Sequence, residues 1–201
     1  MPGSFWLDES TSIRYTEGRA FSYGDINYTK AGANPETFAG LGFVQVTVGD
    51  RPDDRFYFIS GPDDTGAYTA TARLLEDEPA VDADGEPVLD RDGNQVINQG
   101  LKSNYIAQQK EVAGSTLAQS DWYVVREAET ATAVPAEITT YRAAVRAACD
   151  SREAAIAAVT TVDELKALLD APAEVLADPA DPESGMVENP EAHLEPWPVQ
   201  E

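Results

Sequence analysis

The sequence contains few of the side chains that most catalytic and metal sites require. Its 201 residues include one cysteine, Cys149, and one histidine, His193. A single cysteine excludes an internal disulfide and offers no thiolate cluster for a metal. A catalytic triad needs a histidine, and His193 lies in a proline-rich stretch far from any Ser or Cys expected in a structured turn. Cys149 falls within an expected helix, where its ordinary role is that of a small, half-buried side chain.

Two other patterns of catalytic sites are weak or missing. The segment "GLGF" (40–43) lacks the remaining spacing and the following helix of a phosphate-binding loop. Carboxylates are numerous, but most of them fall in expected turns and exposed faces, where solvated charge is their usual state. We therefore predict that the chain is not an enzyme and that it has no cofactor and no metal site.

Positive charge is also scarce. The chain has 14 Lys and Arg residues against 36 Asp and Glu, with a formal net charge of -22 and a pI near 4.1. Such a chain repels phosphate, so we predict that it binds neither nucleic acid nor a membrane surface. No apolar run approaches membrane-spanning length, and "MPGSFWLDES" lacks the basic start and apolar core of a signal peptide. We expect a protein that is made and kept in a cytoplasm.

The first 75 residues are typical of a small β-rich domain, because short aromatic and β-branched runs alternate with Gly, Pro, Asn and Asp. The alternation in "GFVQVTV" predicts a strand of an antiparallel sheet with one wet face. Its less exposed residues are expected to be Val44, Val46 and Val48. The segments "RFYFIS" and "AYTATARLL" are predicted to form a hairpin around a turn at 60–68.

Aromatic residues gather in this domain, and two roles are open for them. Sugar-binding sites often use aromatic rings beside Asp and Asn, and both are present here. A small β domain also uses such rings to build its core, which is the ordinary role for most of them. The residues concerned are Phe5, Trp6, Tyr15, Phe21, Tyr23, Tyr28, Phe38, Phe43, Phe56, Tyr57, Phe58 and Tyr68.

An eight-residue unit occurs twice within residues 76–100, as "DADGEPVL" at Asp82 and "DRDGNQVI" at Asp90. Each copy places an Asp-Gly turn before a Val, which predicts a ribbon of reverse turns. Calcium is the alternative, but an EF-hand loop spreads its ligands over about twelve positions with a closing Glu, and here the glycine comes one position too early. We therefore predict structural turns. Their expected apolar contacts are Val88, Leu89, Val96 and Ile97.

The next segments are predicted to form a helix and a strand. Apolar residues at helical spacing predict a helix over 101–119, which Gly114 is expected to weaken or end. The segment "DWYVVREAET" (121–130) has the composition of a buried strand that runs into a charged turn.

Two further helices are predicted before residue 171. One has Pro135 as its first residue and carries an apolar stripe on an alanine-rich background. The other, "TVDELKALLD", opens with Thr161 and Glu164 in capping-box spacing. We expect these two helices to fold back on one another as a helical hairpin.

Residues 171–201 contain no Lys or Arg, are rich in proline and show no periodicity. Such a composition is typical of an extended tail without a core of its own. Leu194 and Trp197 are large apolar residues, which are seldom left free in solvent. We expect them to dock on this chain or on a partner.

Together these segments predict an α+β fold. A small antiparallel β-rich domain is followed by a turn ribbon, a strand with a helical hairpin, and an extended acidic tail. The corresponding residues are 1–75, 76–100, 101–170 and 171–201.

The order of the segments resembles that of small tail-associated proteins of tailed bacteriophages, particularly those that infect cyanobacteria. The segments concerned are "RPDDRFYFISGP", "AYTATARLL", "LKSNYIAQQK", "SDWYVVREAE", "VPAEITTYRAAVRAA" and "TVDELKALL". The chain is similar to tail fibre assembly proteins, whose C-terminal part has an Asp-Trp strand start, then a helix with a Tyr-Arg pair and another Arg one turn on. The matching residues are Asp121, Trp122, Tyr141, Arg142 and Arg146, with Leu41 and Gly42 upstream.

This resemblance implies a partner of a tail fibre or spike. We predict a structural protein of the phage tail, associated with the fibre or baseplate, that acts through protein contacts within a larger oligomeric assembly. Its expected location is the virion tail, and the host cytoplasm during assembly. The alternatives are a tail fibre assembly chaperone absent from the mature virion and a carbohydrate-binding receptor module. The turn ribbon and the acidic tail depart from the shorter assembly proteins. This departure counts against the chaperone role and makes a permanent virion component an equal alternative.

Arginines on the strand and the long helix are among the few cations available to meet carboxylates of the tail or of a neighbouring subunit, notably Arg126, Arg142 and Arg146. The predicted partner-binding residues are Trp122, Tyr141, Arg142, Arg146, Leu194 and Trp197.

Overall fold

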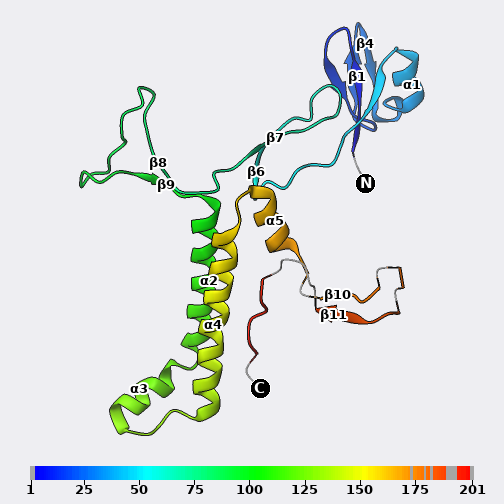
Figure 1. Ribbon diagram of the computed structural model, residues 1–201. Helices are drawn as coiled ribbons and strands as arrows, with labels where there is room; N and C mark the ends of the chain where they lie inside the picture. Colours follow the sequence, from blue (N-terminus) through cyan, green and yellow to red (C-terminus); the bar gives the residue numbers. More distant parts are fainter. Residues whose placement is uncertain (1–2, 173, 179, 182, 189–193, 200–201) are drawn as a thin grey trace. The chain divides into compact units, whose positions relative to one another are not determined.

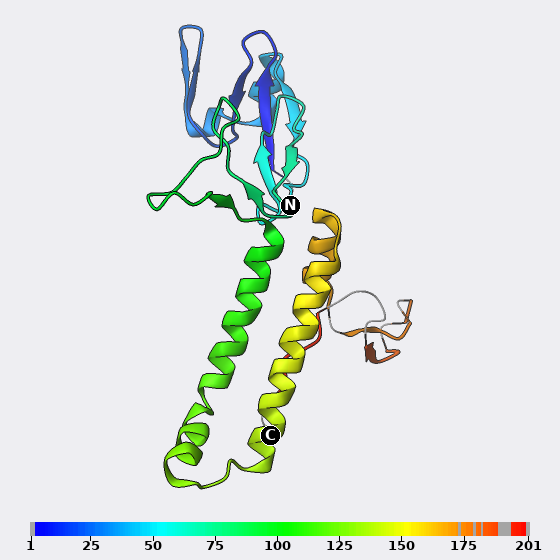
Figure 2. The same ribbon diagram turned by 60° about the vertical axis from the view of Figure 1, so that its left-hand side comes forward.

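The computed structural model describes residues 3–172, 174–178, 180–181, 183–188 and 194–199 (Figures 1 and 2). The chain divides into two compact units, residues 1–72 and 73–201. Small antiparallel sheets lie in both units and the long helices in the second, so the predicted α+β class is confirmed.

The N-terminal unit is built on a three-stranded antiparallel sheet with β1 at its centre. Trp6 of β1 pairs with Tyr15 on one side and with Gln45 on the other. A second hairpin, a single 3₁₀ turn and a short helix complete this part. The elements are β1 (Ser4–Asp8), β2 (Ile13–Tyr15), β3 (Phe21–Tyr23), β4 (Ile26–Tyr28), η1 (Lys30–Gly32), α1 (Pro35–Gly40) and β5 (Val44–Thr47).

Aromatic rings form the core of this unit. Trp6, Phe38 and Phe43 are buried together with Ala33, and the half-buried rings of neighbouring strands pack against them. Tyr15 stacks on Phe43 with ring centroids 4.8 Å apart. The core role expected for most of the aromatic residues is therefore confirmed for this cluster.

The exposure pattern predicted for β5 was partly wrong. Val44 is 44% exposed, whereas Phe43 is buried. Phe43 immediately precedes the strand, and its ring turns into the aromatic cluster, where burial of a large ring is worth more than burial of a valine.

The predicted hairpin is confirmed. β6 (Tyr57–Ser60) pairs with β7 (Thr69–Ala72) in antiparallel register. Asp63 closes the turn, because its Oδ1 accepts hydrogen bonds from the backbone N–H groups of Thr65 and Ala67. These bonds, and one from the Thr65 hydroxyl, hold the pKa of Asp63 below its usual value.

The ribbon in the second unit contains three related segments rather than two. β8 (Glu78–Pro79) pairs with β9 (Ile97–Asn98), which brings "EPAVD" at 78–82 beside the two copies read from the sequence. Ala80, Val88 and Val96 form a closed ring of backbone hydrogen bonds. The bonds run from Ala80 N to Val96 O, from Val96 N to Val88 O and from Val88 N to Ala80 O, at 2.8, 2.9 and 2.9 Å.

A single side chain and two equivalent turns hold the ribbon. Gln95 Nε2 lies 2.7, 3.2 and 3.1 Å from the carbonyl oxygens of Ala80, Val88 and Val96. Asp82 and Asp90 each accept two backbone hydrogen bonds of 2.9 Å within their turns. The predicted turns are confirmed. The expected apolar packing is not, because Leu89 is 57% and Ile97 46% exposed.

A long helical hairpin dominates the second unit. α2 (Leu101–Ala118) and α4 (Ala136–Ala158) lie side by side in Figures 1 and 2. They are antiparallel, because Lys102 Nζ donates to Ala157 O at 3.0 Å and Arg142 Nη1 to Leu117 O at 2.8 Å. α2 continues through Gly114, so the expected break there was wrong.

The helical hairpin is formed by a different pair of helices from the pair predicted. The long partner of α4 is α2, and not the short helix α5 (Val162–Asp170). A helix of 23 residues needs a partner of comparable length to cover its apolar stripe, and α5 has only nine. The Thr161–Glu164 capping box of α5 is present as predicted, and α4 begins at Ala136 with Pro135 as its N-cap.

The predicted strand at 121–130 was wrong, because these residues form helix α3 (Asp121–Thr130). β-branched and aromatic residues favour a strand only where a neighbouring strand offers backbone partners. Here the preceding helix ends at Ala118, and Asp121 in the first turn suits a helix N-terminus. The described part of the tail also contains a hairpin, β10 (Glu174–Leu176) with β11 (Met186–Glu188), where an extended chain was expected.

Gly66 is a position at which the N-terminal unit tolerates no side chain. Its φ is +84°, and a Cβ there would lie 2.2 Å from the carbonyl oxygen of Thr47. We expect Gly66→Ala to lower the free energy of unfolding of this unit by several kcal/mol, since backbone strain of about 1–2 kcal/mol is added to a steric clash. Hydrogen exchange of the β1 and β5 amides would measure the change.

Gly42 provides the matched control for this prediction. Its φ is +82°, but no atom lies within 4 Å of the position of its Cβ. Gly42→Ala should therefore cost only the strain, about 1–2 kcal/mol. Equal losses for the two variants would contradict the close approach of Gly66 to β5.

Candidate protein-contact surfaces

Arg142, a predicted contact residue, is buried where α2, α3 and α4 meet. Its Nη1 donates to Leu117 O at 2.8 Å and to Ser120 Oγ at 2.7 Å, and its Nη2 lies 2.8 Å from Asp121 Oδ1. The guanidinium therefore binds the end of α2 and the start of α3 in its own chain. It meets a carboxylate, as predicted, but that carboxylate belongs neither to the tail nor to a second subunit.

Arg146 is exposed one turn further along α4, and its Nη1 donates to Arg142 O at 3.3 Å. It lines an open hollow of about 370 Å³ between α3 and the beginning of α4. The other lining residues are Val124, Glu127, Val134, Thr139 and Arg142. The lining of this hollow is mostly polar, with two valines and an accessible cation, Arg146.

Trp122 lies on α3, the helix at the turn of the hairpin in Figures 1 and 2. It is 52% exposed and stacks on Tyr123 with ring centroids 3.8 Å apart. Arg126 lies over both rings, with its Cζ 5.0 and 5.3 Å from their centroids. Val125 is also exposed, at 53%, so α3 leaves large apolar side chains in contact with solvent. We call Trp122, Tyr123, Val125 and Arg126 the α3 surface.

Trp197 packs on the hairpin of its own unit. Its ring lies against the buried cluster of Ala113, Val145 and Cys149, so the expected docking of this residue is confirmed. The guanidinium of Arg152 lies over the Trp197 ring, with its Cζ 4.7 Å from the ring centroid. Its Nε donates a hydrogen bond to Glu195 O at 2.8 Å. We call this surface of α2 and α4 the Trp197 groove. Leu194 is half-buried.

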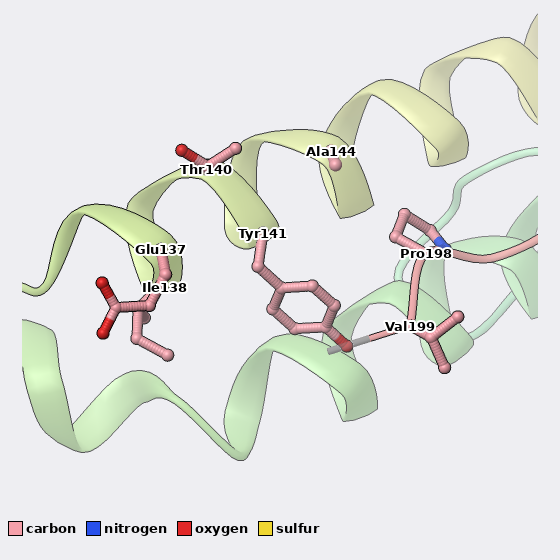
Figure 3. Close-up of a pocket in the computed structure, with 7 residues that line it drawn as sticks. All are labelled: Glu137, Ile138, Thr140, Tyr141, Ala144, Pro198 and Val199. Atoms are coloured by element: carbon pink, nitrogen blue, oxygen red, sulfur yellow. The ribbon is translucent and has the colours of Figure 1, made fainter. Parts of the chain in front are cut away.

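Tyr141 extends the Trp197 groove toward the beginning of α4. Figure 3 shows its ring reaching from α4 toward the segment that carries Pro198 and Val199. An open hollow of about 380 Å³ lies between this segment and α4. Tyr141 and the tail residues Pro198 and Val199 therefore line the same hollow, and Val199 is 87% exposed.

The Trp197 groove contains two groups whose pKa is shifted by their surroundings, Cys149 and Arg152. Burial raises the pKa of the Cys149 thiol, and a hydrogen bond to Glu153 and the charge of that carboxylate act in the same direction. Burial lowers the pKa of Arg152, although the negative charge of Glu195 opposes this effect. Cys149 is therefore a buried thiol beside the Trp197 ring, and its surroundings disfavour the thiolate.

Residues that the sequence reading did not single out hold the groove together. Arg152 Nη1 bonds Gln109 Oε1 across the hairpin at 3.1 Å, and Lys110 pairs with Glu153 at 3.0 Å. The positions of Gln109 and Arg152 on the apolar stripes of their helices were the available signal, since a polar residue on such a stripe needs a partner.

Among the described residues no three His, Cys, Asp or Glu side chains gather closely enough to hold a metal ion. No helix in the same part of the chain is both long and apolar enough to cross a bilayer. His193 lies outside the described residues.

Comparison with known proteins shows no relative. The chain matches no family model, no curated protein and no solved structure.

Arg142 and Arg146 offer a matched pair for mutation, since they lie one turn apart on the same helix. We expect Arg142→Ala to lower the free energy of unfolding by about 2 kcal/mol, because it removes the buried guanidinium that bonds the Leu117 carbonyl, Ser120 and Asp121, although Ser120 Oγ still donates to Leu117 O. Arg146→Ala should change it by less than about 0.5 kcal/mol. Urea denaturation followed by far-UV circular dichroism would measure both, and equal losses would contradict the distinction.

Cys149 is a built-in reporter of tail docking. We expect Trp197→Ala to increase the rate of thiol labelling several-fold, because the thiol loses its cover and its pKa falls toward the usual value. Met186→Ala, which alters a 56% exposed side chain of β11, should leave the rate unchanged. A disulfide-exchange reagent followed by absorbance suffices, and identical rates for all three proteins would show that the ring does not protect Cys149.

Proposed function

We propose that this chain is a structural protein of a bacteriophage tail, associated with the fibre or baseplate, and that it acts through protein–protein contacts. The phage assignment is supported by the resemblance of segment order and of the Tyr141, Arg142 and Arg146 pattern on α4. Asp121 and Trp122 match the assembly proteins in sequence, but here they begin a helix and not a strand. The contact role is supported by the side chains that the folded chain exposes.

The α3 surface is the observation that carries the proposal. Trp122 and Val125 remain about half exposed, and Arg126 stacks on the Trp122 ring. Its Nε atom is buried and has no hydrogen-bond acceptor within the described part of the chain. Trp, Tyr and Arg are the residues most enriched at the energetic centres of protein interfaces. A partner that covers this surface would bury the apolar area and supply the missing acceptor.

The turn ribbon offers a second exposed apolar set. Val81, Leu89 and Ile97 occupy equivalent positions in its three segments and are 60, 57 and 46% exposed. The surrounding aspartates and glutamates give the ribbon a negative charge, which suits contact with a basic partner surface. Such exposure on separate elements is typical of a component of a larger assembly.

The alternatives make different demands on the structure. A carbohydrate-binding role would require accessible rings: Trp6, Phe38 and Phe43 are buried in the core, whereas Phe58 is 59% exposed. An assembly chaperone would use the same kinds of contact surface as a virion component. The difference between these two lies in whether the protein stays on the particle.

Mass spectrometry of purified particles of the phage that encodes this chain would test the proposal directly. We expect the protein at a few to some tens of copies per particle, calibrated against other tail proteins of the same particles. Abundance in infected cells together with absence from particles would indicate the chaperone instead. Absence from both the tail fraction and any fibre pull-down would overturn the phage assignment.

The α3 surface can be tested in the same particles. We expect Trp122→Ser with Val125→Ser to reduce incorporation at least tenfold, because loss of an interface tryptophan costs about 2 kcal/mol or more. Thermal stability should stay nearly unchanged, since both side chains are exposed. Val112→Ser, at a 42% exposed position of α2, is the matched control. Incorporation that is normal for the double variant would exclude α3 as the contact surface.

A further inference from the structure

The C-terminal segment is held on the hairpin by a small number of contacts. They comprise the Trp197 ring against the buried cluster, the Glu195 carbonyl that accepts from Arg152, and Pro198 and Val199 beside Tyr141. All of them are made by residues 194–199, and their partners lie on α2 and α4. The segment is therefore held on the surface of α2 and α4 in the manner of a short peptide ligand.

The groove recognises features that any copy of this segment would offer. Arg152 binds a backbone carbonyl and lies over the ring, and the buried cluster packs against the ring. Arg152 is itself oriented from the opposite helix by Gln109, so its position does not depend on the tail alone. None of these contacts requires that the ligand and the groove belong to the same molecule.

The connection to the groove is long. Residues 171–193 separate the end of α5 from the docked segment, and an extended chain spans up to about 3.3–3.6 Å per residue. The β10–β11 hairpin shortens this reach when it is formed. A second molecule held nearby is therefore within range of the same segment.

We propose that the Trp197 groove of one molecule binds residues 194–199 of a second copy of this chain, so that exchanged tails link copies held next to each other. In a free molecule the attached segment has an effective concentration in the millimolar range and occupies its own groove. A tail makes the same contacts in its own groove and in the groove of a neighbour. Binding to the neighbour therefore competes with binding to its own groove once assembly brings the copies to a similar, millimolar local concentration. The proposal does not depend on the phage assignment.

Electrostatic repulsion sets the conditions for exchange. Each copy carries a formal charge of -22, which opposes association of free molecules at low ionic strength. Raising the salt concentration toward 1 M shortens the screening length to about 3 Å and removes most of this repulsion. The packing of the Trp197 ring against Ala113, Val145 and Cys149 is apolar and is not weakened by salt, unlike the contact with Arg152.

Two complementary variants of the full chain test the exchange. Trp197→Ala keeps the groove but lacks the anchoring ring, whereas Arg152→Glu keeps the tail but has a damaged groove. We expect each variant alone to be monomeric at high salt, and their equimolar mixture to form a 1:1 complex in sedimentation velocity. Arg152→Gln is a milder second form of the groove variant, and circular dichroism verifies the fold of each.

The control mixture combines Trp197→Ala with a protein that carries both substitutions, so that no intact tail is present. It should remain monomeric. A complex in this control would show association through another surface and would overturn the proposal. Absence of a complex in the complementary mixture, at millimolar protein and with both folds intact, would also overturn it.

A free peptide tests binding by the Trp197 groove independently of the connecting residues 171–193. We expect a fluorescein-labelled peptide of residues 193–199, "HLEPWPV", to bind the Trp197→Ala protein in fluorescence polarisation, and a peptide with Ala in place of Trp not to bind. Binding of the peptide without a protein complex would mean that the connection prevents exchange, which would refute the proposal. Failure of the peptide to bind would refute it at the groove itself.

Discussion

The buried guanidinium of Arg142 joins the three helices on which the second unit depends. It binds the last turn of α2, the hydroxyl of Ser120 and the first residue of α3 from a position on α4. A planar donor with several N–H groups can satisfy such divergent acceptors at once, which a lysine cannot. The direction in which α3 leaves the hairpin, and therefore the exposure of its apolar side chains, follows from this one joint.

The few cations of this acidic chain are used largely within it. Lys102 is buried between Glu76 and the end of α4, and Arg152 joins α2, α4 and the tail. Such pairs hold separate segments together where apolar burial is limited. The surplus carboxylates lie on the turns and the ribbon. Their negative charge repels other copies of the chain and so disfavours unselective association through the exposed apolar groups.

Several elements could be predicted from the sequence because their signals are local. The capping box of α5 needs only Thr161 and Glu164, and the ribbon turns need only an Asp that bonds its own backbone. The helix at 121–130 could not be predicted in this way. Its Trp, Tyr and Val residues favour a strand, and only the absence of a pairing strand and the Arg142 joint decide otherwise.

The candidate contact surfaces were likewise predictable in part. The composition of the tail indicated that Trp197 would dock, because a tryptophan without cover is costly. Its partners could not be read from the sequence, since Arg152 and Gln109 lie 43 residues apart and meet only when α2 and α4 pair. The sequence by itself determined charge, turn chemistry and most helix positions, which depend on near neighbours. Only the tertiary structure decided which helices pair, which arginine is buried and which apolar groups stay exposed, because these follow from contacts between distant segments.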